Sequence, residues 1–547
     1  MKKLSFLLLF IVVVSCKKQP TTTLPTWERY DQAQQLAESQ KNESARMKYQ
    51  LIQSRVRDRN EIWQAASTQL QDFDEEDYAT FYPLIYNRDI PSIQKAISDR
   101  KLTYKQLTQW YMFRIVKFES DVDKFTNSII TINPNAVAEA IERDKNRNNE
   151  NHPVFGMPII IKDNIGLKGT ATTAGAAAFL DNYADDAFIV SRIKEKGGII
   201  LAKSNLSEWA NFLCGVCPNG YSAVGGQTLN AYGRKKIDTG GSSSGSGVSM
   251  AANYAAAAVG TETSGSILSP SSQSSLVGLK PTVGLLSRGG IVPISSTLDT
   301  PGPMTRNVTD NAILLDAMSG EDPKDVATKN NPKEKIYIET VTEGTLKGFR
   351  FGAFKNFMDN ELYKASIEKI KAQGGEIIEF EPPKIELEKF LTLLNGDMFV
   401  DLPEYIKSYA SAKVSVKNNA DVMTFNLQDS TARSPYGQAR FEGVVNENIS
   451  KAELDVVRYF LHTEGKRYFN TPMDSLNLDA VLSINNYSAG FAAAAKYPAL
   501  TIPMGYNKDG VPFGITFISR AFEEPKLLRW GYAFEQATKA RKVPAGY

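Results

Sequence analysis

The sequence predicts an α/β protein with a large mixed, mostly parallel β-sheet that is covered by helices on both faces. Two apolar runs, residues 159–161 and 199–202, consist only of Ile, Leu and Ala, and such continuous runs are typical of strands buried on both faces. Between them, residues 185–197 have helical spacing of apolar positions and end at a glycine. Further apolar runs and a helical segment follow in residues 348–380 and 497–520, as expected for an α/β sheet.

The first fifteen residues have the layout of an export signal. Lys2 and Lys3 precede an apolar run at residues 4–14, which is too short for a stable membrane span. Cys16 follows directly, in a setting that resembles the lipobox of bacterial lipoproteins. We therefore expect residues 1–15 to be a lipoprotein signal peptide and Cys16 to carry the lipid, with an ordinary signal peptide as the alternative. The protein would then be exported and lipid-anchored to the bacterial cell envelope, on the periplasmic side or at the outer membrane.

Composition divides the rest of the chain into a tether, an extension and one large domain. Residues 16–26 contain the lipidated Cys and a polar stretch with two prolines, which predicts a tether. Residues 27–88 are rich in Gln, Arg, Glu and Ala without a continuous apolar stripe, and predict a peripheral helical extension. Residues 89–547 form the main domain. Within it, residues 385–475 are expected to be mainly helical and to lie over the substrate side.

Charge and residue counts narrow the classes of partner and chemistry. The 547 residues include 63 basic and 61 acidic side chains, and without Lys2 and Lys3 the two numbers are equal. A neutral balance gives no electrostatic reason to expect nucleic acid as a partner. His152 and His462 are the only histidines, which disfavours a histidine-rich metal site and a Ser-His-Asp triad. We expect neither a metal nor any other cofactor.

The remaining cysteines, Cys214 and Cys217, form a CxxC pair. In an exported protein such a pair can be a disulfide, a redox pair or two idle thiols. A closed zinc site is disfavoured because it needs four ligands and the sequence has no second CxxC.

Residues 238–266, DTGGSSSGSGVSMAANYAAAAVGTETSGS, contain two glycine/serine patches around an alanine-rich segment. Neither patch matches a phosphate-binding glycine motif. The apolar segment at residues 248–259 predicts a core helix that fixes the distance between the patches. Catalysis by a serine requires a base, and Lys162, at the end of the first apolar run, could serve if burial lowers its pKa.

Four segments together carry a specific resemblance. They are PIIIKDN (158–164), GGSSSGSG (240–247), GTETSGSILSPSS (260–272) and residues 278–306, which begin GLKPTVG. The chain resembles the amidase signature family over about residues 92–540, and within that family it is most similar to the bacterial peptide amidases. The resemblance implies the amidase signature fold and a Ser-Ser-Lys triad in which one serine follows a cis peptide bond.

Carried over position by position, the resemblance assigns Lys162 as the base, Ser242 as the serine of the cis peptide and Ser266 as the nucleophile. Lys162 would take a proton from Ser242, which would take one from Ser266. Two further groups are implied. The oxyanion hole would consist of backbone N–H groups of Thr263, Ser264, Gly265 and Ser266. The supporting residues would be Gly240, Gly241, Ser243 and Thr261.

The function predicted is hydrolysis of a carboxamide C–N bond through an acyl-enzyme, with release of ammonia or an amine from a small-molecule or peptide amide. Ser264 and Leu268 depart from the family pattern and put the substrate contacts in doubt, but not the reaction. One alternative is the same chemistry on acyl or aryl amides. Others are an amidotransferase subunit, which export argues against, and a non-catalytic envelope binding lipoprotein. The oligomeric state is not predicted.

Overall fold

The computed structural model describes residues 24–148, 151–332 and 337–547. The expected signal peptide (1–15), Cys16 and most of the tether lie outside the described residues. None of the helices in the described ranges combines the length and the apolar composition that crossing a bilayer requires.

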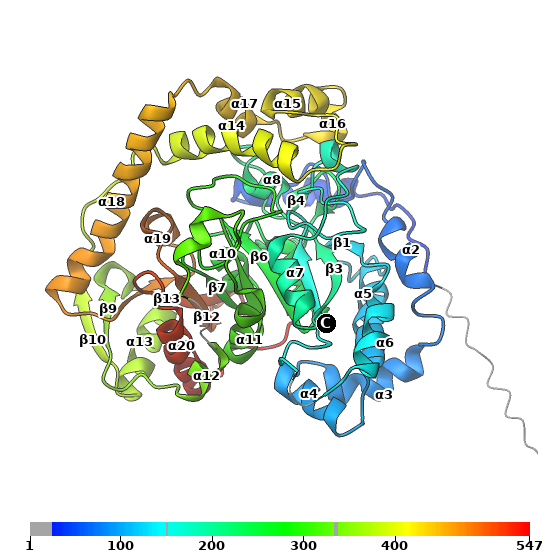
Figure 1. Ribbon diagram of the computed structural model, residues 1–547, viewed down its shortest axis with the longest axis horizontal. Helices are drawn as coiled ribbons and strands as arrows, with labels where there is room; N and C mark the ends of the chain where they lie inside the picture. The colour runs from blue at the N-terminus through cyan, green and yellow to red at the C-terminus, as the bar shows by residue number, and fades with distance from the viewer. Residues whose placement is uncertain (1–23, 149–150, 333–336) are drawn as a thin grey trace, which may run out of the picture.

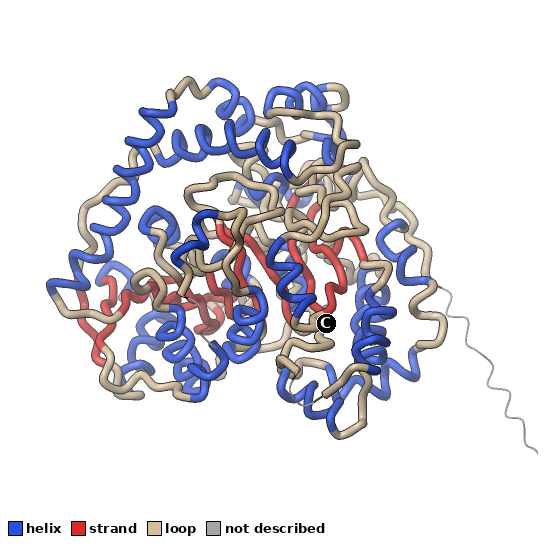
Figure 2. Tube along the Cα trace, viewed as in Figure 1, coloured by secondary structure: helices blue, strands red, loops and turns tan. Residues whose placement is uncertain are grey.

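An eleven-stranded sheet runs through the middle of the molecule (Figures 1 and 2). In spatial order its strands are β1 (Ile129–Ile132), β3 (Ile199–Ser204), β2 (Pro158–Lys162), β6 (Ala257–Glu262), β8 (Thr300–Thr305), β7 (Val277–Lys280), β12 (Ala499–Tyr506), β13 (Pro512–Ile518), β11 (Ala480–Ile484), β9 (Arg350–Phe354) and β10 (Glu376–Phe380). A separate two-stranded sheet consists of β4 (Tyr221–Ser222) and β5 (Gly226–Gln227).

Helices of the first half of the chain are α1 (Ala33–Ser39), η1 (Ala45–Met47), α2 (Glu61–Ser67), α3 (Glu75–Ile85), α4 (Ile90–Ser98), α5 (Tyr104–Glu119), α6 (Ala136–Lys145), η2 (Ala177–Phe179), α7 (Phe188–Glu195), α8 (Glu208–Asn211), α9 (Ser244–Ala251) and α10 (Leu268–Gln273). Those of the second half are α11 (Val308–Met318), η3 (Val326–Asn330), α12 (Tyr337–Thr342), η4 (Lys355–Phe357), α13 (Glu361–Ala372), α14 (Phe390–Ser408), α15 (Asn419–Leu427), α16 (Ser430–Arg433), α17 (Ala439–Asn446), α18 (Lys451–Ser475), α19 (Ala489–Ala495) and α20 (Glu524–Thr538).

The α/β class and the large mixed sheet are confirmed, with one difference in strand direction. Parallel pairing joins β3, β2 and β6, and also β11, β9 and β10. The other six neighbouring pairs are antiparallel, so the parallel share is smaller than the sequence pattern predicted. The physical reason is that an antiparallel strand buried on both faces is as continuously apolar as a parallel one, and the run at 497–520 proves to be an antiparallel hairpin of β12 and β13.

Helices cover both faces of the sheet. Along β12, Thr501 Oγ1 forms a 3.1 Å hydrogen bond with Ser272 Oγ of α10, whereas Leu500 and Ile502 lie against Gly531 of α20. Because successive side chains of a strand point to opposite faces, α10 and α20 cover opposite faces. Every residue of β6, which contacts α9 and α11, is buried.

The segment at 27–88 is integrated into the main body and is not a separate extension. Its helices α1, α2 and α3 are short, and Trp27 and Phe73 belong to the same hydrophobic cluster as the strands β2 and β6. The Arg59 guanidinium lies 4.6 Å from the centre of the Trp27 ring and pairs with Glu119 at 2.6 Å. Burial of aromatic rings and of a paired charge ties the segment to the core.

Residues 385–475 contain α14 to α18, which arch over the sheet in Figure 1. Met398 of α14 and Val444 of α17 share a second hydrophobic cluster with Phe179 of η2 and Trp209 of α8. This arch therefore packs on the short helices that follow β2 and β3 in the chain.

The expectation of one core helix at residues 248–259 is wrong. Helix α9 ends at Ala251, Asn253 adopts a positive φ of 59°, and residues from Ala257 onward form strand β6. An alanine run has no polar positions whose spacing would separate helix from strand. A strand is favoured at this buried position, because pairing with β2 satisfies the backbone N–H and C=O groups of the segment.

Candidate active site

The two glycine/serine segments and the end of β2 meet in one place. Strand β6 pairs with β2 next to Lys162, and α9 begins at Ser244, directly after the first glycine/serine segment. The backbone N–H of Ser243 donates to the carbonyl oxygen of Ser266 at 3.2 Å. The fold therefore brings together residues that are distant in the chain, since Ser242 is 80 positions and Thr261 is 99 positions from Lys162.

Lys162 is fully buried and hydrogen-bonded to both neighbouring segments. Its Nζ lies 2.8 Å from Ser242 Oγ, 2.8 Å from Thr261 Oγ1 and 3.2 Å from the Thr261 carbonyl oxygen. Burial lowers the pKa of Lys162 from 10.5 to about 7, although the negative charges of Asp299 and Glu262 act in the opposite direction. A large fraction of Lys162 is therefore neutral near pH 7 and able to accept a proton.

The turn before Ser242 has no room for side chains. The peptide bond between Gly241 and Ser242 is cis. A Cβ at Gly240, which has φ +64°, would lie 2.7 Å from the backbone nitrogen of Pro270, and one at Gly241 would lie 2.7 Å from Asn219 Oδ1. Only glycine fits such contacts, which gives a physical reason for the double glycine.

Ser266 is the least connected of the three predicted triad residues. Its side chain is 7% exposed, and among the described residues no hydrogen bond joins its hydroxyl to that of Ser242. The structure thus contains the first link of the predicted relay, Lys162 to Ser242, but not the second. The Ser266 segment is nevertheless held beside Ser242 through the backbone bond to Ser243.

The loop that carries Ser266 is organised by Glu262, which the sequence analysis did not identify. The Glu262 carboxylate accepts hydrogen bonds from the backbone N–H groups of Gly265 at 2.7 Å, Ile267 at 2.7 Å and Leu268 at 3.0 Å. Hydrogen bonds to an ionised acceptor are stronger than neutral ones. Glu262 therefore holds the loop in one conformation.

This network changes the predicted oxyanion hole. Because the N–H of Gly265 already donates to Glu262, it cannot also serve an oxyanion in this conformation. The N–H groups of Thr263, Ser264 and Ser266 have no hydrogen-bond acceptor within the part of the chain that the structure describes. These three remain available to a ligand.

Thr261 and Ser243, the predicted supporting residues, are hydrogen-bonded to each other beside Lys162, and Asn164 also bonds to Thr261. Thr261 Oγ1 accepts from Lys162 and, at 3.0 Å, from Asn164 Nδ2. Ser243 Oγ donates to the Thr261 carbonyl at 3.0 Å and accepts from the Thr261 N–H at 3.1 Å. Ser243 thus holds the backbone of Thr261 and Asn164 holds its side chain. Because Lys162 donates to Thr261, these bonds also fix the position of Lys162 Nζ.

A second buried lysine lies near the site. Lys203 on β3 pairs with Asp163 at 3.0 Å, and both side chains are inaccessible to solvent. Lys203 also donates to Thr172 Oγ1 at 2.8 Å, and Asp163 accepts from the hydroxyl of Thr173. This ion pair joins the residue after Lys162 to the neighbouring strand and has a structural role.

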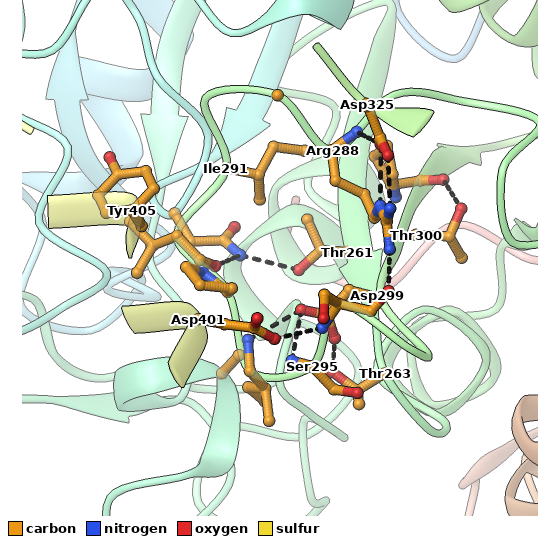
Figure 3. Close-up of a pocket in the computed structure, with 18 of the residues that line it drawn as sticks. Thr261, Thr263, Arg288, Ile291, Ser295, Asp299, Thr300, Asp325, Asp401 and Tyr405 are labelled. Carbon is orange, nitrogen blue, oxygen red and sulfur yellow. Dashed lines mark hydrogen bonds and ion pairs between the residues drawn. The ribbon is translucent and has the colours of Figure 1, made fainter. Parts of the chain in front are cut away.

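A cavity of about 170 Å³ lies beside the site and reaches it at Thr261 and Thr263 (Figure 3). Residues of α14, among them Asp401 and Tyr405, form another part of its wall. Asp299 is a further wall residue and accepts hydrogen bonds from Thr263 Oγ1 at 2.5 Å and from the N–H groups of Ile294 and Ser295. The expected position of residues 385–475 over the substrate side is consistent with this wall.

Other residues singled out in the sequence lie outside the site. Leu268 is buried in an apolar cluster with Ala489 and Tyr497, so this departure from the family pattern is a packing substitution. Cys214 and Cys217 are joined in a disulfide, which the sequence left open. Each histidine side chain forms a hydrogen bond with the backbone, His152 with Val154 and His462 with Ala494.

Glu262, Asn164 and Asp299 are the residues that sequence reasoning missed. Each lies within one of the four motifs that carry the family resemblance, and this position was the available signal that they belong to the site. Their roles depend on hydrogen bonds that form only in the folded protein.

Comparisons with known proteins agree on one family. The family model for amidases matches residues 108–450. A probable amidase of Arabidopsis thaliana is 36% identical over 481 residues, which cover 84% of this chain and 92% of the plant protein. The crystal structure of an amidase family protein from Bacillus anthracis has a TM-score of 0.86 and 36% identity, over 90% of this chain and 99% of that one. The peptide amidase of Stenotrophomonas maltophilia has a TM-score of 0.80 and 34% identity, over 84% and 98% of the two chains.

Proposed function

This chain belongs to the amidase family and hydrolyses the carbon–nitrogen bond of amides, and on that premise we propose that Ser266 is its nucleophile, Ser242 its proton relay and Lys162 its base. The observation that carries the proposal is the 2.8 Å hydrogen bond between Lys162 Nζ and Ser242 Oγ at a fully buried position. A lysine with a pKa lowered to about 7 has the proton affinity that a general base needs near neutral pH.

The hydrogen bonds of Lys162 set the direction of proton transfer. Neutral Nζ has two hydrogens and one lone pair. The two oxygens of Thr261 accept both hydrogens, which leaves the lone pair to receive the proton of the Ser242 hydroxyl. Ser242 Oγ in turn takes the proton of Ser266, whose hydroxyl turns toward Ser242 when substrate binds.

The reaction then proceeds through an acyl-enzyme. Ser266 Oγ attacks the carbonyl carbon of the amide, and the proton held by Lys162 returns through Ser242 to the leaving nitrogen as the C–N bond breaks. Water hydrolyses the ester by the same steps in reverse order. The oxyanion is stabilised by the N–H groups of Thr263, Ser264 and Ser266, and loss of one such donor typically costs about 3 to 4 kcal/mol in the transition state.

For the substrate, we propose a small amide or a peptide with a C-terminal carboxamide, cleaved to release ammonia or an amine. The support is the likeness to a peptide amidase over 84% of this chain. Acyl and aryl amides are the competing substrates. A panel of peptide, fatty and aryl amides, each supplied to the purified protein as a competitor of the others, distinguishes them by kcat/KM.

Replacement and labelling of Ser266 test the mechanism. Ser266→Ala is expected to lower amide turnover by at least about a thousandfold, and a fluorophosphonate is expected to label the wild type but not this variant. Ser475→Ala, an exposed serine at the end of α18, is the matched control and should retain both label and activity. Turnover that persists in Ser266→Ala would overturn the assignment.

We also propose that Cys16 is lipidated and anchors the protein to the cell envelope after removal of residues 1–15. The support is the order of two lysines, an apolar run and a cysteine at the start of the chain. Cells fed a fatty acid with a detectable tag should incorporate it into the wild type and not into Cys16→Ala. Equal incorporation into both proteins, or none into either, would contradict the proposal.

A further inference from the structure

The cavity beside the active site has an excess of negative charge in its wall. The charged lining residues are Asp299, Asp325, Asp401, Glu404, Arg288 and Lys324. Carboxylates outnumber cations in this set, and they come from three separate parts of the chain. When these carboxyl groups are ionised, the cavity favours a cation over an anion.

Two of the acids are already committed to the protein. Asp325 forms a two-point ion pair with Arg288, with Nη2 to Oδ1 at 2.5 Å and Nε to Oδ2 at 2.9 Å. Asp299 accepts three hydrogen bonds, from Thr263 Oγ1 and from two backbone N–H groups. These contacts fix the wall. On α14, the exposed Glu404 accepts a hydrogen bond from Ser408 Oγ at 2.6 Å and lies 3.9 Å from Lys407 Nζ, which leaves Asp401 to be explained.

Asp401 and Glu404 lie one helical turn apart on α14. Asp401 accepts from the N–H of Ser296 at 2.5 Å, and no lysine or arginine of the described residues forms an ion pair with it. Burial raises the pKa of Asp401 to about 7, and the nearby charges of Asp397 and Asp299 act in the same direction. A cation bound next to Asp401 would act in the opposite direction and favour the ionised carboxylate. Figure 3 shows Asp401 on the same side of the cavity as Asp299 and Ser295.

Asn164 supplies an independent sign of a ligand at the same cavity. Its side chain is 2% exposed and lines the cavity, and its Nδ2 donates to Thr261 Oγ1. Its Oδ1 has no hydrogen-bond donor among the described residues. A buried acceptor without a partner is unfavourable, and a substrate N–H next to Thr261 would satisfy it.

We propose that this cavity binds a cationic group of the substrate, an ammonium or a guanidinium, with Asp401 as the residue that determines this specificity and the exposed Glu404 as a weaker contributor of negative charge. Asn164 Oδ1 accepts an N–H of the same substrate beside the reacting carboxamide. The inference rests on the proposed function and deepens it: the preferred substrates are amides, peptide amides included, that carry a positive charge close to the scissile bond.

Matched substrate pairs test the proposal. Peptide amides that end in lysine or norleucine, and in arginine or citrulline, differ in charge at nearly equal size. The wild type is expected to hydrolyse the charged member of each pair with a kcat/KM at least about tenfold higher. Asp401→Asn and the double variant with Glu404→Gln should reduce this ratio stepwise toward one, because kcat/KM falls much more for the lysine and arginine amides than for the norleucine and citrulline amides.

The control is Glu442→Gln, which removes an exposed carboxylate from α17 of the same arch but not from the cavity. It should preserve the charge preference of the wild type. Hexylammonium should inhibit the wild type competitively and inhibit Asp401→Asn at least about tenfold more weakly, because the ion pair is lost.

Two results would overturn the inference: hydrolysis by the wild type without charge preference, and an equal loss of activity on charged and neutral amides in Asp401→Asn. A failure of the proposed function would look different. In that case the wild type would turn over none of the amides, and Ser266 would not be labelled.

Discussion

The backbone N–H of Ser243 donates a 3.2 Å hydrogen bond to the carbonyl oxygen of Ser266. This single contact joins the two glycine/serine segments directly beside the residues proposed to exchange a proton. Because it is a backbone contact, it holds the segments together whatever the orientation of the two side-chain hydroxyls. The contact uses neither side-chain hydroxyl, so both remain available to the proposed relay.

The dependence of activity on pH should report the titration of Lys162. Since burial lowers the pKa of Lys162 to about 7 and only neutral lysine accepts a proton, kcat/KM should rise with pH up to about 7 and level off above it. The measurement is kcat/KM between pH 5 and 10 for an uncharged amide. A rise that continues to pH 10 would show that the base is a lysine of ordinary pKa.

The stability of the protein should respond to the same group. The folded-state pKa of Lys162 lies below the ordinary value of 10.5, so between about pH 7 and 10.5 the unfolded chain binds more protons, and this contribution to stability rises with pH. Lys162→Met should be more stable than the wild type below pH 7. The difference in the midpoint of denaturation should shrink as pH increases through this window, whereas a constant difference would contradict the assigned shift.

Glu262 should prove to be a positioning residue for the nucleophile loop. Glu262→Gln retains one carbonyl oxygen for three backbone donors, so at least one buried N–H loses its acceptor. We expect kcat to fall by about 10- to 100-fold, in proportion to the 1.5–3 kcal/mol typical of hydrogen bonds to charged groups, with a much smaller change in KM. The rate of fluorophosphonate labelling at Ser266 should fall in parallel.

A purely structural role of Glu262 would affect stability but not this rate. Glu262→Asp, which keeps the charge on a shorter side chain, should recover part of the activity. Equal rates of labelling in the wild type and Glu262→Gln would argue against a positioning role.

The buried pair of Lys203 and Asp163 should matter for folding more than for chemistry. Lys203→Met removes one partner and leaves a buried carboxylate without a cation, which typically destabilises a protein by about 3–5 kcal/mol. The double variant Lys203→Met with Asp163→Asn should be less destabilised than this single one. Denaturant unfolding of the two variants checks the order, and the reverse order would contradict a paired role.

Much of the fold and site could be predicted from local patterns. The apolar run that ends at Lys162 does form a buried strand, and the double glycine before Ser242 does stand where no side chain fits. The alanine-rich segment at 248–259 was wrongly predicted as one helix, because alanine suits a helix and a strand buried in a sheet alike. The sequence predicted a mostly parallel sheet, whereas only some of the strand pairs are parallel. The reason is that a buried strand is continuously apolar in either direction.

The sequence by itself determined which residues are candidates for the chemistry: a lysine that ends an apolar run, and two serines in separate glycine/serine segments. These are local features, carried by residue types in a fixed order. Only the tertiary structure decided that Glu262 occupies the N–H of Gly265, and that Asp401 from a distant helix shares a cavity with Asn164. The physical reason is that such contacts depend on the order of strands in the sheet and on the packing of α14 over it, which no short stretch of the chain encodes.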